Sequence, residues 1–164
     1  HFTMGLSAIF ATFAGFYYWF PKLWGRMMNE RLGKVHFWLT FVCVYLVFMT
    51  MHLMGFTGAV RRYSAFVDDF MAPLMPTNRF ISVAALLLGA VQFIFLYNAI
   101  WSRFKGPKAS DNPWQATTLE WDTTSPPPFD NFGGRQMTIH HGPMEYDGDH
   151  SVMQTSEEES IAGT

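Results

Sequence analysis

Long runs of uncharged, mostly apolar residues alternate with short charged stretches over the first two thirds of the chain. An α-helix rises about 1.5 Å per residue, so a run of about 20 residues can cross a hydrocarbon core of about 30 Å. The pattern predicts an all-α membrane protein with three transmembrane helices, at about residues 1–20, 35–60 and 78–103. An irregular tail that contains prolines is expected over residues 104–164, acidic and mobile near its end.

The distribution of Lys and Arg predicts how these helices cross the membrane. The stretch 21–34 carries four basic residues and the start of the tail, 103–108, carries three, while the stretch 61–79 carries three. Three spans place the first two stretches on the same side, and basic residues are enriched on the cytoplasmic side. We therefore expect the tail to be cytoplasmic and residue 1 to lie at the opposite face.

Composition excludes several classes of function. Of the 164 residues 49% are hydrophobic and only 15% are charged, and a net charge of −2 gives no basis for nucleic-acid binding. The single Cys43 allows neither an intrachain disulfide nor a CxxC metal site. Because the chain starts with His and its first run lacks the charged n-region typical of a signal peptide, we expect it to be the C-terminal portion of a longer protein, or a processed chain.

The first run has a candidate site at its beginning. Helical spacing places His1 on one stripe with four small residues, Gly5, Ala8, Thr12 and Gly15. Such a stripe allows another helix, or a large flat group, to approach the backbone closely. Two interpretations follow: a tight helix–helix contact with a capping histidine, or a metal or haem ligand.

Arg61 and Arg62 are expected on the same side of the membrane as His1. Adjacent arginines at a boundary are commonly membrane anchors that contact lipid phosphate. On the side where basic residues are less frequent, however, they favour an anionic partner. The two propionates of a haem would supply one, since guanidinium groups form forked hydrogen bonds with carboxylates. The spacing alone leaves both interpretations open.

Ordered motifs resemble those of subunit I of the haem–copper oxidases, over about residues 1–132. Residues 1–21 resemble the tenth helix of that subunit, and residues 32–38 (LGKVHFW) resemble the start of the eleventh. Residues 51–63 (MHLMGFTGAVRRY) are similar to its His-Leu…Arg-Arg-Tyr segment. Residues 111–128 contain the family's Asn-Pro-Trp…Leu-Glu-Trp…Ser-Pro-Pro-Pro signature.

The resemblance implies roles for three residues. His1 would be an axial ligand of the low-spin haem, expected to be haem a, and Arg61 and Arg62 would hold the haem propionates. An alternative register, in which Thr3 replaces the second histidine of the family's His-x-His pair, requires a two-residue deletion before Pro21. The family's proline before the arginine pair is Val60 here, which leaves the local bend of the helix open.

The same resemblance implies the surroundings of this chain. Its three helices would belong to a twelve-helix bundle, with the high-spin haem and copper B in the upstream part of the subunit and no catalytic residue in this chain. Subunits II and III, CuA in a partner subunit, cytochrome c and the lipid bilayer are the expected partners. The expected location is a bacterial inner membrane, rather than the mitochondrial inner membrane.

The implied function is that of a respiratory terminal oxidase, which reduces O₂ to water with electrons from cytochrome c and pumps protons. Two alternatives stay open. One is a quinol oxidase of the same superfamily, and the other is a haem-free membrane anchor or assembly module.

The other polar candidates have simpler interpretations. His36 is expected to be a boundary or packed residue, and His52 to be neutral and hydrogen-bonded to a neighbouring helix. Asp68 and Asp69 are typical of a solvated turn. The histidines of the acidic tail lack a regular metal-ligand spacing, and we interpret them as solvated: His140, His141 and His150.

Overall fold

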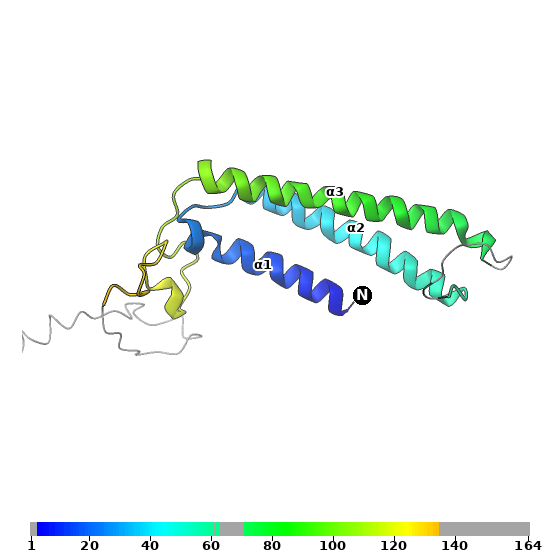
Figure 1. Cartoon of the computed structure of the whole chain (residues 1–164), viewed down its shortest axis with the longest axis horizontal. Coiled ribbons are helices and arrows are strands. Elements are labelled where there is room, and N and C mark those ends of the chain that lie inside the picture. Colours follow the sequence, from blue (N-terminus) through cyan, green and yellow to red (C-terminus); the bar gives the residue numbers. More distant parts are fainter. Residues whose placement is uncertain (1–2, 61, 63–70, 135–164) are drawn as a thin grey trace, which may run out of the picture. The chain divides into compact units, whose positions relative to one another are not determined.

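The computed structural model describes residues 3–60, 62 and 71–134 (Figure 1). This part of the chain contains three long α-helices, two short 3₁₀-helices and no β-strand, which confirms the all-α prediction for the described residues. The chain divides into two compact units, His1–Ala14 with Asn29–Trp101, and Gly15–Met28 with Ser102–Thr164.

Helix α1 spans Met4–Trp24 and contains Pro21 in its last turn. The predicted first span ended at Phe20, because proline cannot donate a backbone hydrogen bond and disfavours a helix interior. The structure instead ends the helix after Trp24, where Gly25 adopts a φ of 63° and its N–H donates to the Pro21 carbonyl at 2.7 Å. A glycine at C′ is a common helix end because it adopts this left-handed conformation at no steric cost.

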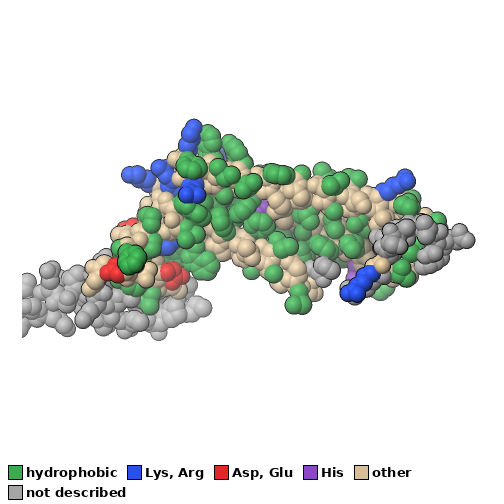
Figure 2. Space-filling view, viewed as in Figure 1, with side chains coloured by type: hydrophobic (Ala, Val, Ile, Leu, Met, Phe, Trp, Pro, Cys, Tyr) green, Lys and Arg blue, Asp and Glu red, His purple; other side chains and the backbone are tan. Residues whose placement is uncertain are grey.

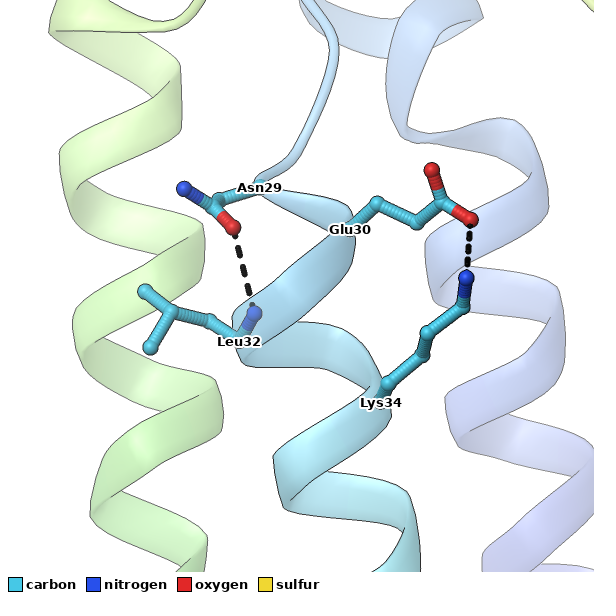
Figure 3. A network of polar contacts seen from close by, with 4 residues as sticks. All are labelled: Asn29, Glu30, Leu32 and Lys34. Carbon is cyan, nitrogen blue, oxygen red and sulfur yellow. Dashed lines mark hydrogen bonds and ion pairs between the residues drawn. The ribbon is translucent and has the colours of Figure 1, made fainter.

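Helix α2 spans Glu30–Phe56 and begins earlier than the predicted residue 35. Asn29 caps it: its side chain accepts a hydrogen bond from the Leu32 N–H at 3.1 Å (Figure 3). Glu30 and Lys34 form an ion pair of 2.7 Å one turn apart, on the solvent-exposed surface of the first turn. The charged first turn is therefore helical although it lies outside the apolar run.

The end of α2 also differs from the predicted residue 60. Thr57 donates its hydroxyl to the Met54 carbonyl at 2.8 Å, and Gly58 has a φ of 90°. A backbone of this kind suits glycine and stops the helix. The chain therefore leaves the helix before Val60 although no proline stands at that position.

The 3₁₀-helix η1, Ala72–Leu74, leads directly into helix α3, Met75–Lys105. Helices α2 and α3 lie side by side in antiparallel orientation (Figure 1). Contacts along their length follow that direction: Asn29 meets Asn98 near one end, and His36 meets Gln92 further along. At the other end a small apolar cluster joins the two helices, formed by Val47, Met54, Ile81 and Ala84.

Two helical segments of the described residues, Glu30–Phe56 and Ala72–Lys105, are long and apolar enough to cross a membrane. Helix α1 does not meet the same criterion, because Tyr, Trp and Pro near its end lower its mean hydropathy. The described chain thus supports two of the three predicted spans by length and composition, and the first span stays a prediction.

In the second unit, Lys22 in the last turn of α1 binds the tail through hydrogen bonds. Its ammonium is buried and donates to the carbonyls of Thr123 at 2.8 Å, Asp111 at 3.2 Å and Thr124 at 3.4 Å. Its Nζ also lies 4.9 Å from the centroid of the Trp121 ring. One cation therefore joins two separate stretches of the tail to the helix.

The electrostatic environment of Lys22 contains two opposing effects. Burial lowers its pKa, while the nearby carboxylates of Asp111, Asp122 and Glu120 raise it. Those three acids belong to the tail, so the charges of the tail compensate part of the desolvation of the ammonium.

Aromatic side chains complete this contact. The 3₁₀-helix η2, Leu119–Trp121, buries Trp121, whose ring meets Tyr18 edge-on at 5.2 Å. The ring of Trp114 stacks against that of Tyr18 at 6.2 Å, and its indole N–H donates to the Tyr18 carbonyl at 2.9 Å. Residues 111–124, part of the predicted irregular tail, therefore have a defined position against α1.

Replacing Lys22 with Met should loosen the tail, because the apolar side chain leaves carbonyl acceptors unpaired in a buried site. We expect a cost of about 1–3 kcal/mol, which corresponds to roughly 5- to 150-fold faster hydrogen exchange at the Trp121 and Ser125 amides. Exchange would be measured by mass spectrometry on the purified complex. Lys34→Met is the matched control, since Lys34 is exposed and pairs only within α2; equal effects of the two variants would contradict the role of Lys22.

Candidate functional site

The first half of α1 has a face that the described chain leaves open. A Cβ added at Gly5 would meet no atom within 4 Å, and Ala8 and Thr12 are exposed. The Thr12 hydroxyl donates to the Ala8 carbonyl at 2.8 Å, so its own helix already satisfies this donor. This face can accept a flat, apolar group or another helix near the backbone.

The open face ends before Gly15. The ring of Trp19, one turn further along, lies 3.1 Å from the position of a Gly15 Cβ and covers that glycine. The predicted stripe is therefore shorter than its spacing suggested: Gly5, Ala8 and Thr12 are accessible, and Gly15 packs against its own helix.

Of the three predicted site residues, only Arg62 falls within the described residues. It is exposed, has a φ of 59°, and forms no ion pair with another described residue. His1 and Arg61 lie outside the described residues. Whether the three side chains meet thus stays a prediction, while Arg62 has a guanidinium available for an anion.

His36 is a packed residue, as one of its two predicted interpretations states. It is 2% exposed, and its Nε2 lies 3.1 Å from Oε1 of Gln92 on α3. The Gln92 amide donates in turn to the Thr40 hydroxyl at 3.3 Å, and the rings of Phe13 and Phe95 cover the imidazole at 4.8 and 5.5 Å. His36, Gln92 and Thr40 therefore form a polar contact between α2 and α3 that apolar side chains surround.

The hydrogen bond expected between His52 and a neighbouring helix stays a prediction. His52 is exposed on α2, and within the described ranges it forms no hydrogen bond with a neighbouring helix; its ring instead meets Phe56 edge-on at 4.9 Å. The cause is its position on the helix, because Val47 and Met54 face α3 and His52 does not.

Sequence reasoning missed the polar residues that join α2 to α3. Asn98 is fully buried; its Oδ1 accepts from the Asn29 N–H at 3.1 Å and its Nδ2 donates to the Asn29 carbonyl at 3.0 Å. Gln92 and Thr40 form the second contact. The available signal was an isolated amide or hydroxyl inside an apolar run, since such groups require a partner in a low-dielectric interior.

The remaining candidates do not form a metal site in the part of the chain that is described. No group of three or more His, Cys, Asp or Glu side chains that could hold a metal occurs among the described residues. Several predicted residues lie outside them: Asp68, Asp69, His140, His141 and His150.

Comparison with known proteins gives a consistent result. Residues 1–102 match the family described as Cytochrome C and Quinol oxidase polypeptide I. The alternative cytochrome c oxidase subunit 1 of Bradyrhizobium diazoefficiens is 44% identical over 141 residues, which cover 85% of this chain and 24% of that protein.

Cytochrome c oxidase subunit 1 of Synechocystis sp. is 41% identical over 157 residues, or 96% of this chain and 28% of that protein. The corresponding protein of Thermostichus vulcanus is 38% identical over 146 residues, or 89% of this chain and 26% of that protein. The chain thus spans about a quarter of the length of these relatives. The match of 157 residues also extends beyond the predicted limit of the resemblance at residue 132.

Proposed function

Because the chain belongs to the cytochrome c and quinol oxidase polypeptide I family, we propose that it is the C-terminal part of the catalytic subunit of a respiratory terminal oxidase. The complete complex would reduce O₂ to water with electrons from cytochrome c and couple this to proton pumping. The observation that carries the proposal is the sequence identity of 38–44% to relatives whose names include cytochrome c oxidase subunit 1, over most of this chain. The family is one of helical membrane proteins, in agreement with the apolar helices α2 and α3.

The haem chemistry that the family uses fits the residues present. His1 would provide a neutral imidazole nitrogen to the iron of the low-spin haem, taken to be haem a, and Arg61 and Arg62 would bind its propionates. Two observations support this assignment: the accessible face of α1 at Gly5, Ala8 and Thr12, and the exposed guanidinium of Arg62, which forms no ion pair with another described residue. When bound, this haem supplies one-electron transfer.

Each residue has a distinct physical task in this proposal. The imidazole of His1 would hold the haem iron, and the identity of such a ligand is one of the main determinants of haem potential. The arginines compensate propionate charge in a region of low dielectric, where an unpaired carboxylate would be costly. The small residues of α1 keep large side chains away from the plane that the macrocycle would occupy.

The remaining machinery is assigned to other parts of the complex. The high-spin haem and copper B would be bound by the upstream part of the subunit, and CuA by a partner subunit. Subunits II and III are proposed neighbours in a bacterial inner membrane, with the tail on the cytoplasmic side, as the distribution of Lys and Arg favours.

A quinol oxidase is the alternative within the same family, whose description includes both electron donors. Oxygen uptake by the purified complex with reduced cytochrome c, and then with a quinol, separates the two. We expect rapid uptake with cytochrome c and little with the quinol. The opposite preference would assign the chain to a quinol oxidase, and no uptake with either donor would favour the haem-free anchor.

Replacing His1 with Ala in the complete complex should remove the low-spin haem signal from the reduced-minus-oxidised spectrum, because the iron loses an axial ligand. The high-spin signal, detected by its reaction with carbon monoxide, should stay. Thr3→Ala is the matched control and should leave both signals unchanged. Loss of the carbon monoxide-reactive signal in His1→Ala, with the low-spin signal intact, would instead support the alternative register.

Replacing Arg61 or Arg62 with Gln should keep the haem bound and lower its midpoint potential. Removal of a nearby positive charge disfavours the added electron, by roughly 20–60 mV for a partly screened interaction. Redox titration followed at the low-spin band measures the shift. Arg79→Gln, which removes an exposed arginine from the start of α3, is the control; an unchanged potential in both site variants would refute the propionate role.

A further inference from the structure

Basic side chains gather at the C-terminal end of α3 (Figure 2). In the second unit, Arg26 and Lys108 face each other in an antiparallel bridge. Two backbone hydrogen bonds extend this pairing: Met27 N–H to the Pro107 carbonyl and Ala109 N–H to the Gly25 carbonyl, both at 2.9 Å. The guanidinium of Arg103 lies 5.9 Å from the centroid of the Trp24 ring, two residues before Arg26 in the chain. We call these three basic residues the basic platform: Arg26, Arg103 and Lys108.

The backbone beneath the basic platform has little freedom. Gly106 ends α3, and a Cβ at this position would lie 2.5 Å from the Ser102 carbonyl oxygen and 2.6 Å from that of Met27. These are backbone atoms and cannot move aside easily, so only glycine fits. The Arg26 guanidinium donates to the Gly106 carbonyl and closes the contact. The close backbone contact at Gly106 therefore holds the segments that carry these charges in fixed positions.

No described carboxylate neutralises the charges of the basic platform. Arg103 and Lys108 are exposed, and among the described residues neither they nor Arg26 form an ion pair with a carboxylate. Large apolar side chains accompany them: Leu23 is 57% exposed and Phe104 is 66% exposed. Cations beside exposed apolar side chains at the end of an apolar helix match a phospholipid, which offers a phosphate next to acyl chains.

We propose that the basic platform binds the headgroup phosphate of an anionic phospholipid, with Leu23 and Phe104 against its acyl chains. The proposal rests on the membrane assignment of α3 and does not depend on the haem roles. An acidic peptide would pair with the charges equally well but would gain little from the two apolar side chains. The lipid is therefore favoured over the acidic end of this chain.

The test uses the purified complex in mild detergent after removal of bound lipid. Phosphatidylglycerol or phosphatidylcholine is titrated in, and bound lipid is counted by native mass spectrometry. The double variant Arg103→Gln/Lys108→Gln should weaken phosphatidylglycerol binding roughly 10- to 30-fold, since each basic residue near an anionic surface contributes appreciably. Phosphatidylcholine binding should not change.

The control is Arg31→Gln/Lys34→Gln, which removes the same charge from exposed positions on the first turn of α2. It should leave phosphatidylglycerol binding within about twofold of the parent protein. Equal loss in both variants, or no loss in the platform variant, would overturn the proposal. Displacement of the lipid by inorganic phosphate would also overturn it, because the site would then bind a free anion.

Deletion of residues 135–164 tests the remaining alternative, that the acidic end of this chain occupies the basic platform. If the deletion tightens phosphatidylglycerol binding in the parent but not in the platform variant, the acidic tail occupies the basic platform and the lipid assignment is wrong. If the deletion changes nothing, the lipid assignment is supported. Haem spectra and oxygen uptake of the platform variant should equal those of the parent, so failure here is distinguishable from failure of the oxidase proposal.

Discussion

The double hydrogen bond between the Asn98 amide and the backbone of Asn29 determines how α2 begins against α3. Asn29 is also the N-cap of α2, so one residue both starts a helix and places it beside another. In an apolar environment helices gain little from hydrophobic contact with each other, because lipid chains are equally apolar. Specific polar contacts and close packing must then determine the register, and the His36–Gln92 contact continues it along the pair.

The long helices could be predicted because an apolar run of this length has few other structures available to it. Their ends could not, since they depend on single residues that the hydropathy pattern does not mark. Asn29 starts α2 before the apolar run, Gly58 stops it early, and α1 continues through Pro21 to Trp24. Proline cannot donate a backbone hydrogen bond, and its ring clashes with the preceding turn. It therefore breaks a helix only where the surrounding backbone cannot adjust to both effects.

The candidate site was predicted by a different route, from motif order and from the side of the membrane rather than from packing. That reasoning assigned Arg62 to a haem propionate, which stays a prediction, and it overestimated the stripe on α1 because Trp19 covers Gly15. It could not find the buried contacts of Asn98 or Gln92. A lone amide in an apolar run shows that a partner is needed, but only the antiparallel pairing shows which residue it is.

Different faces of the helices call for different neighbours. Leu86 on α3 is 75% exposed and Phe93 is 70% exposed, and a helix that is apolar on all sides is stable in a membrane or within a larger protein. Large side chains of this kind pack well against disordered acyl chains. The small residues Ala8 and Thr12 on α1 instead allow a rigid neighbour to approach the backbone closely. The chain spans about a quarter of the length of its relatives, so many of its surfaces need neighbours. The contrast in side-chain size separates the surface suited to lipid from the surface suited to a cofactor or another helix.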